Sequence, residues 1–248
     1  MATTVQRPPN IAAYQAGAGG DMLRRALLAC GVTSSLLYGT IMLAIRYQGY
    51  SLRSQTVSEL SAWGVSTRPL WIVLGSFYAA LIVAFGCGVV LSARDRLALR
   101  VAGWLLFAYG VLGVLWPFAA MHQREVLAVG GKTIADTGHL VLAATTVILM
   151  FAAMGAGAVA LRGWFRLYSA VSMLVLLAFG GLTSAYASKV QANLATPLVG
   201  VWERINIGVF LVWIVVLAFT LWRDRESPPF TLPGTGARTT HSEGAVRP

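Results

Sequence analysis

Six long apolar runs constrain the fold of this chain more than any other feature of its sequence. They lie at approximately 23–45, 70–92, 98–118, 139–161, 164–186 and 203–222. Each is close to the roughly 20 residues that a helix needs to cross the hydrocarbon core of a bilayer. Lipid offers no partner to backbone polar groups, so continuous apolar runs span a membrane as helices, whereas a β-barrel needs short alternating segments. The sequence therefore predicts an all-α, polytopic membrane bundle of six transmembrane helices.

Composition and charge placement agree with a membrane protein. The 248 residues are 57% hydrophobic and 11% charged, whereas about a quarter of the residues of a soluble domain are charged. The net charge of +10 raises the question of nucleic acid, but Lys and Arg flank the apolar runs instead of gathering on one face or in one tail, so we expect no nucleic-acid partner. Cys30 and Cys87 lie inside apolar runs and are expected to be small buried thiols.

The apolar runs divide the chain into three parts. Residues 1–21 are expected to form a disordered tail, 22–222 the six-helix domain, and 223–248 a second disordered tail rich in Pro, Gly, Thr and Ser. The first run is too long for a signal peptide, and no A-x-A-like site follows it, so we expect it to be retained. With the N-terminus inside, 12 of the 19 Lys and Arg fall on the inner side and 7 on the outer side. This bias predicts cytoplasmic termini and a multi-pass protein of the cell (inner) membrane.

The first outer loop, 46–69, carries a T-x-x-E spacing from Thr56 to Glu59. This spacing is typical of a capping box, in which hydroxyl and carboxylate satisfy backbone N–H groups reciprocally. One interpretation is a short re-entrant or interfacial helix that is capped at Thr56 and stops at Gly64. The other makes Glu59 an acid, a base or an ion ligand that faces a cavity, and the two are compatible.

The second outer loop, 119–138, holds His122, and Asp136 and His139 mark the entry to the fourth span. Asp136 or Thr137 is a candidate helix cap. Alternatively, an ionisable group just inside a membrane helix indicates function. Two histidines and nearby carboxylates are possible zinc ligands, but no H-x-x-x-H or C-x-x-C spacing supports a site, so we expect no metal and no cofactor.

The third outer loop, 187–202, leads into Glu203 and Arg204. We expect Glu203 in the first turn of the sixth span, where the helix dipole favours a carboxylate. Arg204 is expected to pair with Glu203 or to reach a lipid phosphate. Polar residues therefore gather near the outer interface, and we predict that they form one ligand-binding cluster: Ser58, Glu59, His122, Asp136, His139, Glu203 and Arg204.

Three of these segments resemble the bacterial and archaeal family known as domain of unknown function 998. They are T-V-S-E-L-S-A-W-G at 56–64, His139 at the start of the fourth span, and G-V-W-E-R-I at 200–205. The resemblance covers most of 22–222, and it implies six spans and no established activity. A more distant similarity, through Ser58-Glu59 and the later Pro69, is to six-span eukaryotic proteins of lipid remodelling and autophagy, and it favours lipid.

Three functions follow as hypotheses. The first is recognition of a membrane lipid or another amphipathic molecule at the outer leaflet through the polar cluster. The second is an integral membrane enzyme that uses Glu59 and His139 as an acid–base pair on a lipid-linked substrate. The third is a small transporter, or a structural subunit of a homo-oligomer or larger membrane complex. A proton-coupled carrier needs acidic groups near the midplane, and the spans show none there.

Overall fold

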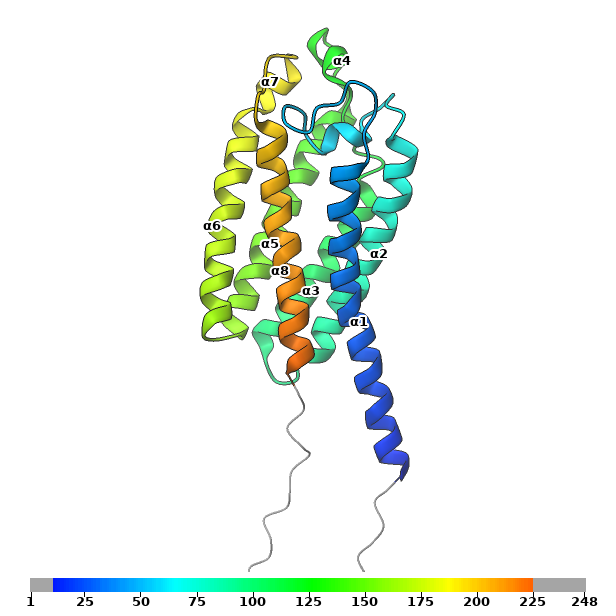
Figure 1. Ribbon diagram of the computed structural model, residues 1–248, viewed down its shortest axis with the longest axis vertical. Coiled ribbons are helices and arrows are strands. Elements are labelled where there is room, and N and C mark those ends of the chain that lie inside the picture. The colour runs from blue at the N-terminus through cyan, green and yellow to red at the C-terminus, as the bar shows by residue number, and fades with distance from the viewer. Residues whose placement is uncertain (1–10, 225–248) are drawn as a thin grey trace, which may run out of the picture.

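A computed structural model describes residues 11–224, which are helical throughout their regular structure, with no strand among them (Figure 1). The long helices are α1 (Ile11–Ala44), α2 (Arg68–Ser92), α3 (Leu97–Leu112), α5 (Ile134–Ala160), α6 (Trp164–Ala185) and α8 (Val199–Arg223). The short ones are the 3-10 turns η1 (Ser58–Ser61) and η2 (Gly113–Leu115) and the helices α4 (Arg124–Ala128) and α7 (Ala187–Gln191). Six helices of this part of the chain are long and apolar enough to cross a membrane, which confirms the predicted all-α, six-span bundle.

The six long helices form a closed ring in chain order. Each packs against the next, from α1 through α2, α3, α5 and α6 to α8, and α8 packs against α1. The start of α1 and the end of α8 lie at one end of the bundle, which we call the terminal end (Figure 1). The opposite end, called the loop end, carries the long connections 45–67, 116–133 and 186–198 with η1, α4 and α7. The ring therefore surrounds an interior that these connections cover from one side.

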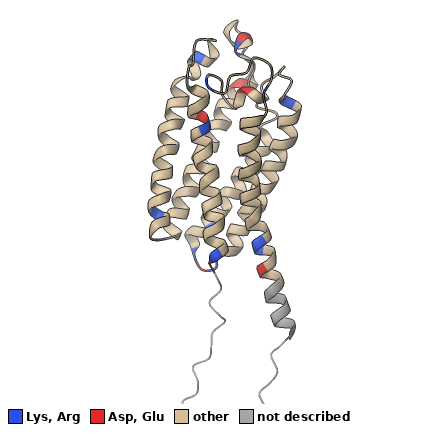
Figure 2. Cartoon of the chain, viewed as in Figure 1, with Lys and Arg blue, Asp and Glu red and all other residues tan. Residues whose placement is uncertain are grey.

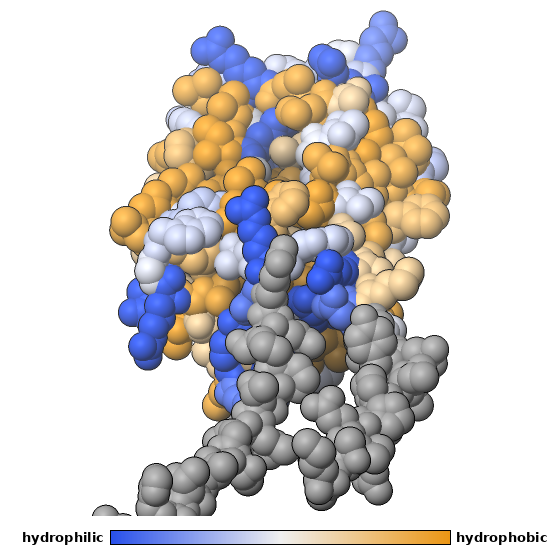
Figure 3. Space-filling view, turned by 60° about the horizontal axis from the view of Figure 1, so that its bottom comes forward, coloured by the Kyte–Doolittle hydropathy of each residue, from blue (hydrophilic) through white to orange (hydrophobic). Residues whose placement is uncertain are grey.

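The surface of the bundle is suited to lipid along its length. Large apolar side chains such as Phe77, Val101, Leu174 and Phe219 point outward and are exposed. Charged residues lie mainly towards the two ends of the helices (Figure 2), and the flanks in Figure 3 are predominantly hydrophobic. An apolar belt between two polar ends matches a bilayer, and the chain is a multi-pass membrane protein.

Polar side chains inside the bundle bind neighbouring helices. Asn206 of α8 donates from its amide nitrogen to the Leu176 carbonyl of α6 at 2.6 Å. Trp213 of α8 donates from its indole nitrogen to the Ser169 hydroxyl of α6 at 2.9 Å. The Trp213 ring also lies over Gly157 of α5, where an added Cβ would approach it to 2.8 Å. Close approach and interhelical hydrogen bonds, which stabilise helix pairs in lipid, thus fix α8 against α5 and α6.

Three helix starts differ from the sequence prediction. α5 begins at Ile134 and α8 at Val199, several residues before the predicted starts at 139 and 203. The first turns of α5 contain Asp136, Thr137 and His139, which interrupt the apolar run that hydropathy detects. α1 begins at Ile11, so 11–21 are helical and do not belong to a tail; the alanine-rich stretch favours helix enough to outweigh its glycines. The remaining predicted tail segments, 1–10 and 225–248, lie outside the described residues.

Candidate functional site

The first loop folds around Glu59, which is 2% exposed. The Thr56 backbone N–H and hydroxyl both donate to one Glu59 carboxylate oxygen, at 2.7 and 2.9 Å, and the Glu59 N–H donates back to the Thr56 hydroxyl at 3.3 Å. The reciprocal contacts of the predicted capping box are therefore present. The helix that follows is only the single 3-10 turn η1, which ends at Ser61 and not at Gly64.

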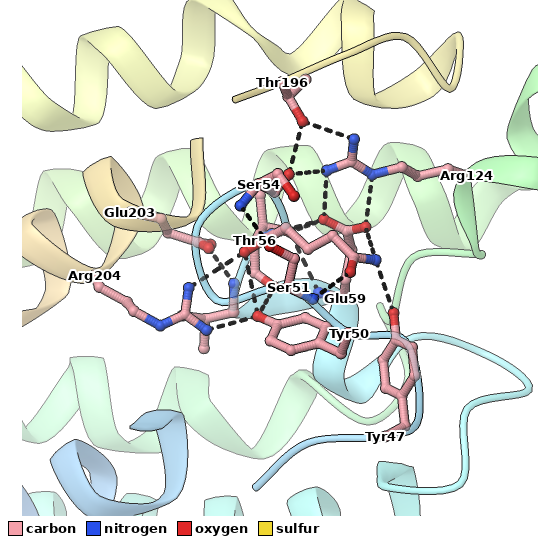
Figure 4. A network of polar contacts seen from close by, with 12 residues as sticks. Tyr47, Tyr50, Ser51, Ser54, Thr56, Glu59, Arg124, Thr196, Glu203 and Arg204 are labelled. Carbon is pink, nitrogen blue, oxygen red and sulfur yellow. Dashed lines mark hydrogen bonds and ion pairs between the residues drawn. The ribbon is translucent and has the colours of Figure 1, made fainter. Parts of the chain in front are cut away.

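Glu59 is paired with Arg124 at the start of α4. Arg124 donates from Nε and Nη2 to the two carboxylate oxygens at 2.6 and 2.8 Å, and both side chains are nearly buried. The same guanidinium donates to the Thr196 hydroxyl at 2.7 Å and to the Ser54 carbonyl at 3.0 Å. Arg124 thus joins all three loops of the loop end (Figure 4), and both Glu59 oxygens serve this structural contact.

Arg204 holds the first loop against α8. It forms no ion pair with Glu203, which was one of its two predicted roles, and its donors bind acceptors inside the protein. Nη1 donates to the carbonyls of Leu52, Gln55 and Gly200 at 2.9, 3.2 and 2.8 Å, and Nη2 donates to the Tyr50 hydroxyl at 2.6 Å. Burial raises the pKa of the Tyr50 phenol, which stays protonated and donates to the Thr56 carbonyl at 2.7 Å.

Gly200 allows the first loop to approach α8 this closely. A Cβ at this position would lie 2.2 Å from the Gln55 carbonyl oxygen and 2.4 Å from that of Leu52. The Gly200 N–H instead donates to the Arg53 carbonyl at 3.1 Å. This backbone hydrogen bond joins the first loop to α8 beside the contacts of Arg204. Any side chain at position 200 would displace the loop.

Glu203 lies in the second turn of α8, because the helix starts at Val199, and not in the first turn as predicted. Its carboxylate accepts hydrogen bonds from the Val57 backbone N–H and, at 3.1 Å, from the Ser58 hydroxyl. Glu203 therefore faces inward towards the first loop (Figure 4) and not along the helix axis as a cap would.

Asp136 holds together the start of α5 and the second loop. Thr133 is the N-cap of α5 and forms a capping box with Asp136, so neither Asp136 nor Thr137 is the cap residue itself. Asp136 also accepts from the His122 backbone N–H at 2.7 Å and contacts His122 Nδ1 at 2.8 Å. His139 makes a separate contact from Nδ1 to the Ala119 carbonyl at 2.9 Å, so no direct contact joins the two histidines.

The predicted cluster is thus divided into three groups. Glu59, Ser58, Glu203 and Arg204 surround the first loop, His122 pairs with Asp136, and His139 stands alone. Within residues 11–224 no three His, Cys, Asp or Glu side chains gather as metal ligands. Sequence reasoning missed Arg124 and Thr196 as partners of this region. Arg124 lies 65 residues from Glu59 and Thr196 lies 142 residues from Ser54, and no local spacing links positions so far apart in the chain.

A cavity of about 690 Å³ lies inside the helix ring at the loop end. Residues from all six long helices and from the first loop line it. Four of the predicted site residues are in its wall, namely Ser58, Asp136, His139 and Glu203, whereas Glu59, His122 and Arg204 are not. Most of the remaining wall is apolar or aromatic. The cavity, and not the loop network of Figure 4, is therefore where the predicted polar groups meet open space.

Comparison with known proteins adds a family assignment. The family model described as a protein of unknown function, DUF998, matches residues 27–220. This match includes all six spans in whole or in large part and every residue of the predicted cluster. Neither a curated protein nor a solved structure is detectably similar to the chain. The chain belongs to the DUF998 family of proteins of unknown function.

Proposed function

We propose that the protein binds a lipid or another amphipathic molecule in the cavity at the loop end. The composition of the cavity wall is the observation that supports this proposal. Its volume of about 690 Å³ falls within the range of roughly 300–1,000 Å³ that is usual for small-molecule sites. Aliphatic and aromatic side chains would hold an apolar chain, while Ser58, Asp136, His139 and Glu203 would face a polar head group. In the predicted orientation this end faces the outer leaflet.

The route of entry would lie between α5 and α6. Leu140 and Ile148 of α5 and Leu177 of α6 line the cavity, yet they are 43%, 66% and 49% exposed. Gly181 of α6 also lines the cavity, and a Cβ there would meet nothing within 4 Å. Residues that belong both to the cavity wall and to the apolar flank connect the two surfaces. A lipid would therefore enter sideways from the bilayer, without its chain crossing water.

Binding is better supported than acid–base catalysis by the predicted pair. His139 lines the cavity, but Glu59 does not, and Arg124 contacts both oxygens of the Glu59 carboxylate. A general acid or base must reach the proton that it transfers. The geometry gives Glu59 a role in holding the loops together, and it leaves no assembled carboxylate–histidine pair of the predicted kind.

Filling the cavity tests the proposal. Ala144 and Val141 are both exposed residues of α5, but Ala144 lines the cavity whereas Val141 lies outside it. We expect Ala144→Phe to occupy space that the lipid needs, and Val141→Phe to leave that space unchanged. Each variant is purified in detergent and exchanged repeatedly into fresh detergent, and the lipid retained per protein is measured by mass spectrometry. The proposal requires retention by the wild type and Val141→Phe and a severalfold loss in Ala144→Phe; equal retention in all three would overturn it.

A further inference from the structure

An aromatic wall lines part of the cavity. Tyr38 of α1 contacts Trp71 of α2 edge to face, with ring centroids 5.7 Å apart, and lies 4.6 Å from the ring of Tyr78. The Tyr78 and Tyr109 hydroxyls are 2.8 Å apart. All four side chains line the cavity, and Trp116 does so too. The faces of aromatic rings carry partial negative charge and attract cations, most strongly when water is excluded.

Glu203 brings a carboxylate group to the wall of the same cavity. None of the ion pairs within residues 11–224 includes Glu203. Its neighbour Arg204 binds carbonyls and the Tyr50 hydroxyl. Two donors reach the Glu203 carboxylate, whereas a carboxylate accepts about four hydrogen bonds. Glu203 therefore keeps capacity for a positively charged partner in the cavity.

The other charged residues of the cavity wall are already satisfied. Arg68 donates to the carbonyls of Ser61 and Pro117 at 2.7 and 2.8 Å, and its guanidinium lies 3.8 Å from the centre of the Trp63 ring. Asp136 accepts four hydrogen bonds from the backbone and side chains of His122 and Thr133. Of the three Asp, Glu and Arg side chains in the cavity wall, only Glu203 therefore keeps unused hydrogen-bonding positions for a ligand.

Two buried polar atoms in the cavity wall lack a hydrogen-bond partner. They are the Trp71 indole nitrogen and the Thr146 hydroxyl, whose residues are 6% and 9% exposed. Buried polar groups in native proteins are nearly always hydrogen-bonded. Both atoms have almost no accessible surface, so they lie behind the surface of the cavity wall and are not contact points for a ligand.

From these contacts we infer that the bound amphiphile carries a positively charged nitrogen. The inference rests on the proposed function and specifies its ligand: an amine or quaternary ammonium head group lies against Glu203 and the aromatic wall formed by Tyr38, Trp71, Tyr78 and Tyr109. Its apolar chain extends towards the opening between α5 and α6.

Head-group preference tests this inference directly. The full-length protein is reconstituted in nanodiscs of an uncharged galactolipid, which offers no competing ammonium group. Binding of three radiolabelled single-chain amphiphiles is compared: dodecyltrimethylammonium, dodecyl sulfate and dodecylglycerol. Protein-free discs supply the background from partition into lipid. We expect the ammonium compound to bind at least about tenfold more tightly than the other two, because a cation meets a desolvated carboxylate.

Glu203→Gln keeps the size of the side chain, an acceptor oxygen for the Val57 N–H and an amide NH2 that can donate to the Ser58 hydroxyl, but it removes the charge. It is expected to weaken ammonium binding at least about tenfold and to leave dodecylglycerol binding within a factor of two. Glu125→Gln is the matched control, because Glu125 is exposed on α4 and outside the cavity wall, and it should behave as the wild type.

The possible results separate the two proposals. Equal binding of the three amphiphiles, or preference for the sulfate, would overturn the cationic head group while leaving lipid binding in place. Ammonium preference that survives in Glu203→Gln would overturn the role of Glu203. Absence of specific binding by all three amphiphiles to wild-type protein would overturn the proposed function itself. The comparison among amphiphiles uses wild-type protein, so it decides the matter even where Glu203→Gln fails to fold.

Discussion

At the scale of single residues, the buried pair of Glu59 and Arg124 is the contact on which the loop end most depends. Replacing Arg124 by leucine would leave the Glu59 carboxylate buried without its cation. Breaking a buried ion pair in this way typically costs about 3–5 kcal/mol. We therefore expect Arg124→Leu to lower the midpoint of thermal unfolding in detergent by many degrees.

The exposed pair of Asp21 and Arg25 provides the control for this prediction. Their side chains are 27% and 45% exposed, and the Nε–Oδ2 distance is 2.7 Å. Exposed pairs contribute about 0–1 kcal/mol, so Arg25→Leu should shift the midpoint little. If the two variants shifted it equally, Glu59 and Arg124 would not be the anchor that their geometry indicates.

The residue types of the site were visible in the sequence, but most of their partners were not. The Thr56–Glu59 spacing predicted a local contact, and that contact is present. Nothing in the sequence links Glu59 to Arg124, because loops that meet through the fold leave no periodic signal. The pairing of Arg204 with Glu203 was predicted wrongly for the same reason: its five acceptors include four on the first loop or the end of α1.

At the scale of elements, the start of α5 links helix formation to the cavity wall. Asp136 accepts bonds from both Thr133 and His122, whereas Thr133 supplies one N-cap. We expect Thr133→Ala to cost about 1 kcal/mol and Asp136→Ala about 2–3 kcal/mol, since several hydrogen bonds to a charged group are lost. Thr137 is exposed, and Thr137→Ala should change the unfolding midpoint least. A larger effect at Thr137 than at Thr133 would place the cap where the sequence first indicated it.

The helices themselves were the most predictable elements. A run of about 20 apolar residues has few alternatives in lipid, and all six runs became helices. The first turns of α5 and α8 were not recognised, because hydropathy does not distinguish a helical turn from a loop. As a result, Glu203 was predicted in the first turn of α8, where the helix dipole would favour it. It lies instead in the second turn, where it lines the cavity. The closing of the ring by α1 and α8 is a tertiary contact that has no counterpart in local sequence.

At the scale of the whole molecule, the ring places the short connection between α2 and α3 at the terminal end and the loop containing α4 at the loop end. A reporter that is active only in the cytoplasm and one that is active only outside it, fused after Arg96 and after Lys132, should therefore show opposite activities. With the termini inside, as the excess of Lys and Arg there predicts, the Arg96 fusion is cytoplasmic and the Lys132 fusion lies outside. Fusions on the same side would contradict the six-span bundle, whereas opposite activities with inverted signs would retain the bundle and turn the cavity towards the inner leaflet. If lipid enters between α5 and α6 on the loop-end half of the bundle, as proposed, the signs of this single pair of fusions also determine which leaflet supplies it.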